Sequence, residues 1–220
     1  MSIEALIVLH IAVLGYWLGS ELIINSEYRY VCWASSLPFS ERRRLMEHVM
    51  DVDQHVRYAL VLQATLGTML AALLGYFPGG APLALGAGAI GVCWLVFVEI
   101  VHRVRHKAIG QRLALLDRLI RYGLLGVLII VGIGTMIGAI NLQGWLAWKL
   151  VLFGGVIACG VGIRVSLIEF FRVWREIETS GSDAAREKSI RWIYTWGTGI
   201  LMLLWVFIAG IAAISVIKPA

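Results

Sequence analysis

Six apolar runs alternate with polar segments along the chain, and each run is close to the length that crosses a bilayer as a helix. A helix needs about 20 apolar residues to cross the ~30 Å hydrocarbon core. The pattern predicts membrane spans at about 3–24, 56–77, 83–101, 120–140, 145–168 and 192–217. It also predicts a short amphipathic helix that begins near Ser40, before the second span. We therefore expect an all-α, polytopic membrane protein with one integral membrane domain over residues 1–220.

The charged residues give this arrangement an orientation. Lys and Arg collect in the first, third and fifth loops and at their borders, whereas the second and fourth loops carry none. By the positive-inside rule, the basic loops are cytoplasmic and both termini are periplasmic, as expected for a multi-pass protein of the bacterial inner membrane. A hydrophobic content of 60% excludes a water-soluble domain. The net charge of +5 follows the loops and forms no compact basic patch, so we expect a lipid bilayer and no nucleic acid as partner.

A weak internal repeat divides the six spans into three pseudo-repeated helical hairpins. Each odd-numbered span ends near a glutamate, and each even-numbered span opens near an arginine followed by an aromatic residue. These residues are Glu21, Glu99, Glu169, Arg57, Arg121 and Arg191. We expect them to form structural ion pairs at the cytoplasmic boundary, where they would be only partly desolvated. A cytoplasmic proton path that ends on the glutamates is the alternative interpretation.

The first span carries the first candidate for chemistry, His10. At a helical period, His10, Leu14, Trp17 and Glu21 share one face. An ionisable side chain within a membrane helix usually faces a protein interior and often has a functional role there. His10 is therefore a candidate ligand or catalytic group, with an interhelical hydrogen bond as the other interpretation.

Lys149 is the second candidate. It lies about one turn into the fifth span from the outer side, and His10 lies about two turns into the first span from the same side, so the two residues can lie at comparable depth and face each other. Lys149 can extend its ammonium to the outer headgroups. In a dry pocket it can instead be a neutral amine that ligates a metal or transfers protons. The other histidines fall outside the predicted spans, so a haem on His10 needs a different second ligand or none.

The segment LHIAVLGYW, which contains His10 and Trp17, resembles the first helix of the HemJ-type protoporphyrinogen oxidases. Residues 46–47 before the second span and Trp148-Lys149-Leu150 in the fifth are also similar to that family. The resemblance covers the first span and loop and the last two spans, whereas the third and fourth spans look inserted. It implies a b-type haem bound through His10 and Lys149, with Trp17 in the same binding region and Lys149 as a candidate catalytic group.

From this resemblance we expect a haem-dependent membrane oxidoreductase or electron-transfer protein that acts on a protoporphyrinogen-like tetrapyrrole and passes electrons to an acceptor such as quinone. Two other functions remain open. The chain also resembles copper-resistance membrane proteins in its helical architecture, which suggests a copper or small-solute permease, although its methionines form no ladder of Cu(I) ligands. A non-catalytic accessory subunit would pack against other membrane subunits, or against copies of itself, through its glycine-rich faces.

Overall fold

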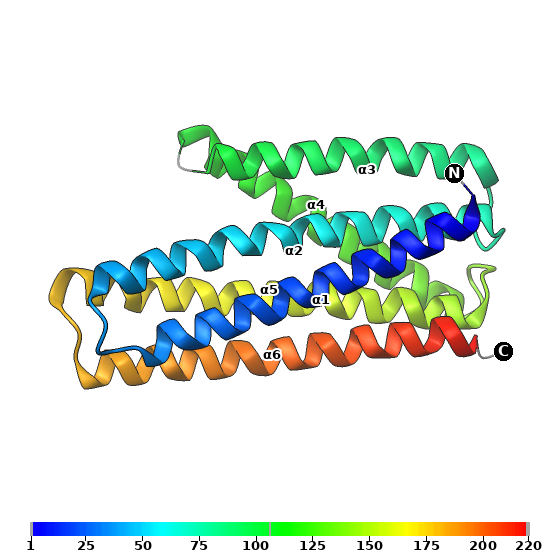
Figure 1. The fold of residues 1–220 in the computed structure, drawn as a ribbon. Helices are drawn as coiled ribbons and strands as arrows, with labels where there is room; N and C mark the ends of the chain where they lie inside the picture. Colours follow the sequence, from blue (N-terminus) through cyan, green and yellow to red (C-terminus); the bar gives the residue numbers. More distant parts are fainter. Residues whose placement is uncertain (1, 106, 219–220) are drawn as a thin grey trace. The chain divides into compact units, whose positions relative to one another are not determined.

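The computed structural model describes residues 2–105 and 107–218, and all regular secondary structure within these residues is helical. Six helices follow one another along the chain (Figure 1). They are α1 (Ile3–Trp33), α2 (Phe39–Leu73), α3 (Gly80–Arg103), α4 (Ala108–Met136), α5 (Gly144–Ser180) and α6 (Ala184–Ile217). Each is long and apolar enough to cross a membrane. The predictions of an all-α chain and of six membrane-crossing helices are confirmed, and these helices indicate a multi-pass membrane protein in a lipid bilayer.

Several helices continue well beyond the apolar runs that predicted them. The 37 residues of α5 correspond to about 55 Å of helix, which exceeds the ~30 Å hydrocarbon core. At its start, α2 includes the predicted amphipathic segment near Ser40, so this segment is not a separate helix. Ion pairs three or four residues apart support such polar helix ends, and Arg172 of α5 makes two, with Glu169 and Glu176. Apolar patterning marks the part of a helix in lipid, whereas these pairs let the helix continue into water.

Local sequence explains where α5 ends and α6 begins. Gly181 follows α5 with a φ of 85°, a left-handed backbone conformation that a residue with a Cβ rarely adopts. Asp183 then caps α6, because its side chain accepts a hydrogen bond from the backbone N–H of Arg186 at 2.8 Å. The polar segment after the fifth span is therefore almost entirely helical, with a short break at Gly181–Asp183.

By its internal contacts the chain divides into two compact units. Unit 1 comprises Met1–Ser26 and Glu47–Leu119, and unit 2 comprises Glu27–Met46 and Ile120–Ala220. In unit 1, α2 and α3 run antiparallel at close range. Gln54 donates a hydrogen bond to the carbonyl of Val98, and farther along the helices a Cβ built on Gly91 would lie 2.3 Å from Oγ1 of Thr65. Only glycine at position 91 allows the two helices to approach this closely.

In unit 2, α5 and α6 lie side by side and antiparallel (Figure 1). A Cβ built on Gly155 of α5 would lie 2.9 Å from the ring of Phe207 in α6, and the hydroxyl of Ser166 donates to the carbonyl of Ile193. Toward the polar end of the pair, Phe170 packs edge-to-face against Tyr28, with ring centroids 4.9 Å apart. Small residues in the apolar part and aromatic rings at the polar end therefore hold unit 2 together.

Candidate functional site

His10 packs against α2 within unit 1. Nε2 of Gln63 donates to the backbone carbonyl of His10 at 2.9 Å. One turn along α2, a Cβ built on Gly67 would lie 3.5 Å from Cε1 of the His10 ring. His10 is half-buried and lies about 10 Å along the helix axis from Ile3. The structure therefore places the imidazole inside the helical unit, against a glycine and close to a second polar residue.

Trp17 and Glu21 follow His10 on the same face of α1, and both are buried. The indole Nε1 of Trp17 donates to Oε1 of Glu21 at 3.1 Å. This bond within one helix provides a partner for two polar groups in an otherwise apolar segment. The helical face predicted from the spacing of His10, Trp17 and Glu21 therefore carries polar groups, and its residues belong to unit 1.

A second polar group in unit 1 joins α1, α2 and α3. Tyr16 and His55 share a hydrogen bond of 2.5 Å between the phenol oxygen and Nδ1. The ring of His55 contacts the ring of Tyr58 edge-to-face, with centroids 6.2 Å apart, and the hydroxyl of Tyr58 donates to Glu99. Four ionisable groups from three helices therefore lie close together, as two hydrogen-bonded pairs that are joined by a ring contact. Sequence reasoning named Glu99, noted the polar position of His55 and counted Tyr58 only as the aromatic residue after Arg57, and it missed Tyr16.

Lys149 lies in unit 2, on α5, and is half-buried. It is one turn from Trp145, a buried residue whose ring lies 5.8 Å from Nζ of Lys218. Trp148, the neighbour of Lys149, is exposed. This end of α5 therefore combines tryptophan and lysine side chains, as is typical of the level where a membrane helix meets the headgroups.

The predicted ion-pair glutamates have partners on their own helices. Glu99 forms an ion pair with Arg103 in addition to its bond from Tyr58. Glu169 pairs with Arg172 at 3.0 Å. Because each of these arginines is only three or four residues away, the pairs stabilise the polar helix end locally.

The predicted arginines have other partners. Arg57 pairs with Asp53 at 2.8 Å, again within one helix. Arg191 of α6 donates from Nε to the carbonyl of Cys32 at 3.4 Å. Arg121 is half-buried on α4 in unit 2. Arg191 therefore ties α6 to the end of α1 through a backbone carbonyl.

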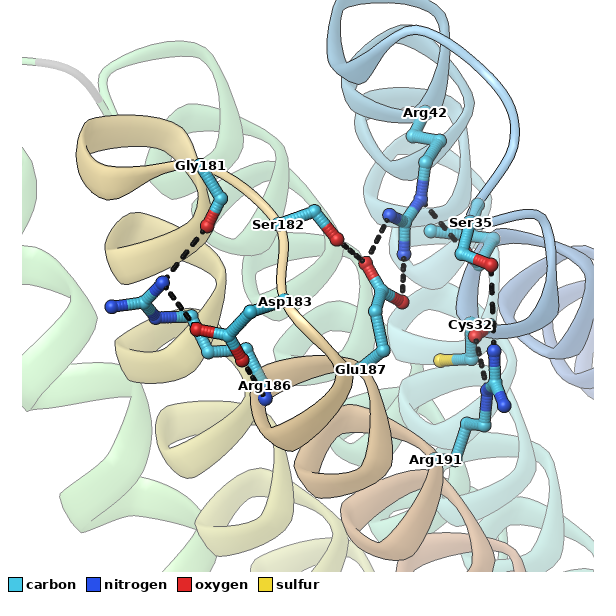
Figure 2. Close-up of polar contacts among 10 residues, drawn as sticks. Cys32, Ser35, Arg42, Gly181, Ser182, Asp183, Arg186, Glu187 and Arg191 are labelled. Atoms are coloured by element: carbon cyan, nitrogen blue, oxygen red, sulfur yellow. Dashed lines mark hydrogen bonds and ion pairs between the residues drawn. The ribbon is translucent and has the colours of Figure 1, made fainter.

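The most enclosed charges in unit 2 are Arg42 of α2 and Glu187 of α6. Figure 2 shows two bonds between them, from NH1 to Oε1 at 2.7 Å and from NH2 to Oε2 at 3.1 Å. Nε of Arg42 also donates to the carbonyl of Val31, and its guanidinium lies 5.2 Å from the ring centre of Trp174. Ser182 donates to the Glu187 carboxylate at 2.6 Å. This bidentate pair therefore joins segments of α1, α2, α5 and α6 at one end of unit 2.

Electrostatics at this pair favour the ionised carboxylate. Burial by itself raises the pKa of Glu187, but the hydrogen bonds from Arg42 and Ser182 outweigh it and lower the pKa below its ordinary value. Sequence reasoning missed the pair: it placed Arg42 in the amphipathic segment that begins near Ser40 and named no partner for it. A signal was nevertheless present: Glu187 begins a stripe of positions three and four residues apart that continues through Ile190 and Tyr194, all of which are buried.

The side chains that could ligate a metal limit which cofactors this protein can hold. Within residues 2–105 and 107–218, no three His, Cys, Asp or Glu side chains lie close enough together to hold a metal ion. Of the other described histidines, His55 bonds Tyr16, which lies six residues after His10 on α1, whereas His48 and His102 lie outside the predicted spans. A lone imidazole fits axial ligation of a haem and does not fit a multi-ligand zinc or copper site.

Comparison with known proteins adds no family assignment. No family model matches the chain, and no curated protein or solved structure shows significant similarity to it.

Proposed function

We propose that this protein is a b-type haem protein of the bacterial inner membrane that acts in oxidoreduction or electron transfer, with His10 as the principal haem ligand. One observation carries the proposal: the half-buried imidazole of His10, on the apolar α1, lies against Gly67 of α2, and Gln63 of α2 donates to the backbone carbonyl of His10. Ionisable side chains are costly within a bilayer, and their usual reason for being there is function. A haem bound at this position supplies a one-electron redox centre.

The residues around His10 would orient such a group. The bond from Gln63 fixes the backbone of α1 at His10, and Gly67 leaves room for the imidazole ring beside α2. Trp17, two turns along the same face, is buried and held by its hydrogen bond to Glu21, and we propose it as part of the same binding region. We propose Lys149 as a second ligand or as a proton-transfer group.

The finer topology belongs to the same proposal. Three helical hairpins with both termini in the periplasm agree with the distribution of Lys and Arg over the loops. A local similarity supports the repeat: Thr68 in α2 and Thr135 in α4, each in a Gly-Thr-Met sequence, donate from their hydroxyls to the carbonyl four residues earlier, at 2.8 Å and 2.9 Å. A tetrapyrrole as substrate and a quinone as electron acceptor remain part of this proposal.

The test is an absorption spectrum of the detergent-purified protein, before and after reduction with dithionite. We expect a reduced b-type spectrum in the wild type that is lost in His10→Ala. His48→Ala is the matched control, because His48 is an exposed histidine on the polar part of α2, and it should retain the haem. Haem that persists unchanged in His10→Ala would refute the ligand assignment, and a colourless wild type from a haem-sufficient host would refute the proposed function.

Lys149 is tested by the same spectra. If its amine is the second ligand, Lys149→Met should convert a six-coordinate, low-spin spectrum to a five-coordinate, high-spin one while the haem stays bound. An unchanged spectrum in Lys149→Met would remove Lys149 from the coordination sphere and leave proton transfer as its proposed role.

A further inference from the structure

A groove of about 380 Å³ lies between α5 and α6 in unit 2. Its lining includes Glu169 and Arg172 of α5 and Lys188 and Trp192 of α6. Because both helices belong to unit 2 and lie side by side, the groove is formed within a single packed pair.

The groove lies at the level where both helices change from apolar to polar. On α5 the apolar run ends at Ile168, just before Glu169, and on α6 the next apolar run begins at Trp192. A membrane helix makes this change where the hydrocarbon core meets the headgroups. The groove is therefore at headgroup depth, whichever side of the membrane this end of unit 2 occupies.

The charge available in the groove is positive. Arg172 contacts the carboxylates of Glu169 and Glu176, each at 3.0 Å, and its side chain is still more than half exposed. Lys188 is exposed and forms no ion pair within the described residues. The ammonium of Lys188 thus supplies the charge that no acidic side chain offsets, and the guanidinium of Arg172 adds further N–H donors.

Exposed apolar side chains continue from the groove along both helices. On α6, Trp192 and Trp196 follow Lys188 at intervals of four residues and are 70% and 47% exposed. On α5, Ile168 and Val165 share the face of Arg172 and are also exposed. Each helix therefore presents a column that begins with a basic residue and continues with apolar ones, which is the order of groups along a phospholipid.

We propose that this groove binds an anionic phospholipid. Its phosphate lies between Lys188 and Arg172, its glycerol region lies against Trp192, and its acyl chains follow the two apolar columns. Basic side chains at the membrane surface attract anionic lipids, and tryptophan is favoured at the depth of the glycerol region. The proposal does not depend on the haem, since it uses only α5 and α6.

Native mass spectrometry of the protein in non-ionic detergent tests the proposal. Palmitoyl-oleoyl phosphatidylglycerol is titrated against phosphatidylcholine with the same acyl chains, on the wild type, Lys188→Gln and the control Lys107→Gln. Lys107 is an exposed lysine outside unit 2. We expect the wild type to prefer phosphatidylglycerol, and Lys188→Gln to weaken that lipid about fivefold, the ratio that corresponds to roughly 1 kcal/mol per basic side chain. Lys107→Gln should bind both lipids as the wild type does.

Two further measurements test whether Trp192 contacts the lipid and whether the site recognises a phospholipid and not a free anion. Trp192→Ala should weaken both lipids by a similar factor, because the indole contacts the part of the lipid that they share. Inorganic phosphate without lipid should not bind measurably. Equal affinity of the wild type for the two lipids, or an equal loss in Lys188→Gln and Lys107→Gln, would overturn the proposal. Binding of inorganic phosphate that is lost in Lys188→Gln would also overturn it, since the site would then recognise a free anion.

Discussion

The ion pair between Arg42 and Glu187 should make a large contribution to stability, and Glu187→Gln tests this. The two side chains are 2% and 8% exposed, so the substitution leaves the guanidinium buried and opposite a neutral amide. Removing one partner of a buried pair typically costs about 3–5 kcal/mol. The amide still offers one acceptor, and the hydrogen bond from Arg42 to the carbonyl of Val31 and the contact of Arg42 with Trp174 remain. We therefore expect a loss of about 3 kcal/mol in the free energy of unfolding.

The neighbouring residue Arg43 provides a matched control. It pairs with Glu178 at 2.8 Å, nearly the distance of the buried pair, but the side chains are 57% and 41% exposed. Exposed pairs usually contribute less than about 1 kcal/mol, so Glu178→Gln should change stability little. The two substitutions are chemically identical and break contacts of nearly equal length, but the buried carboxylate also accepts a second bond from Arg42 and one from Ser182.

The assay is denaturant unfolding in mild detergent, followed by tryptophan fluorescence and far-UV circular dichroism. The double variant Arg42→Met/Glu187→Leu completes the test. It removes both charges at once, and we expect it to cost less than Glu187→Gln alone, because no buried charge is left unpaired. If Glu187→Gln and Glu178→Gln lower the free energy of unfolding equally, the argument that burial determines the strength of the pair is wrong.

Three other predictions follow from particular contacts. Because the pKa of Glu187 is lowered on folding, its contribution to stability should be complete above pH 4.5 and lost as the pH falls below that value. The loss at low pH should be smaller in Glu187→Gln when both proteins are unfolded in denaturant at a series of pH values. Gly91→Ala should destabilise unit 1 by about 1–3 kcal/mol, since the new methyl would meet Thr65, whereas Gly86→Ala should be tolerated because no described atom lies within 4 Å of a Cβ there. Thermal denaturation of the two variants checks this, and equal melting temperatures would contradict it. Asp183→Ala removes the cap of α6 and should cost about 1 kcal/mol, with faster amide hydrogen exchange confined to the first turn of that helix.

The fold class and the membrane spans could be predicted from the sequence because they depend on local properties. An apolar run must form a helix in lipid, since its backbone groups have no other partners there, and six runs therefore predict six helices. The helix ends could not be placed in this way. The sequence pattern predicts a polar loop at residues 169–180, yet these residues continue α5. Ion pairs such as that of Arg172 with Glu176 stabilise a helix without any apolar pattern.

Side-chain partners depended on the tertiary structure. The spacing of His10 and Trp17 placed them on one face of a helix, but only the packing of α2 showed that this face meets Gln63 and Gly67. The sequence likewise contains Arg42 and Arg43 as two similar basic residues. Folding buries the first against Glu187 and leaves the second at the surface. The physical reason is that hydrophobicity and helical period act along the chain, whereas the partner of a polar side chain depends on which residues, distant in sequence, are packed beside it.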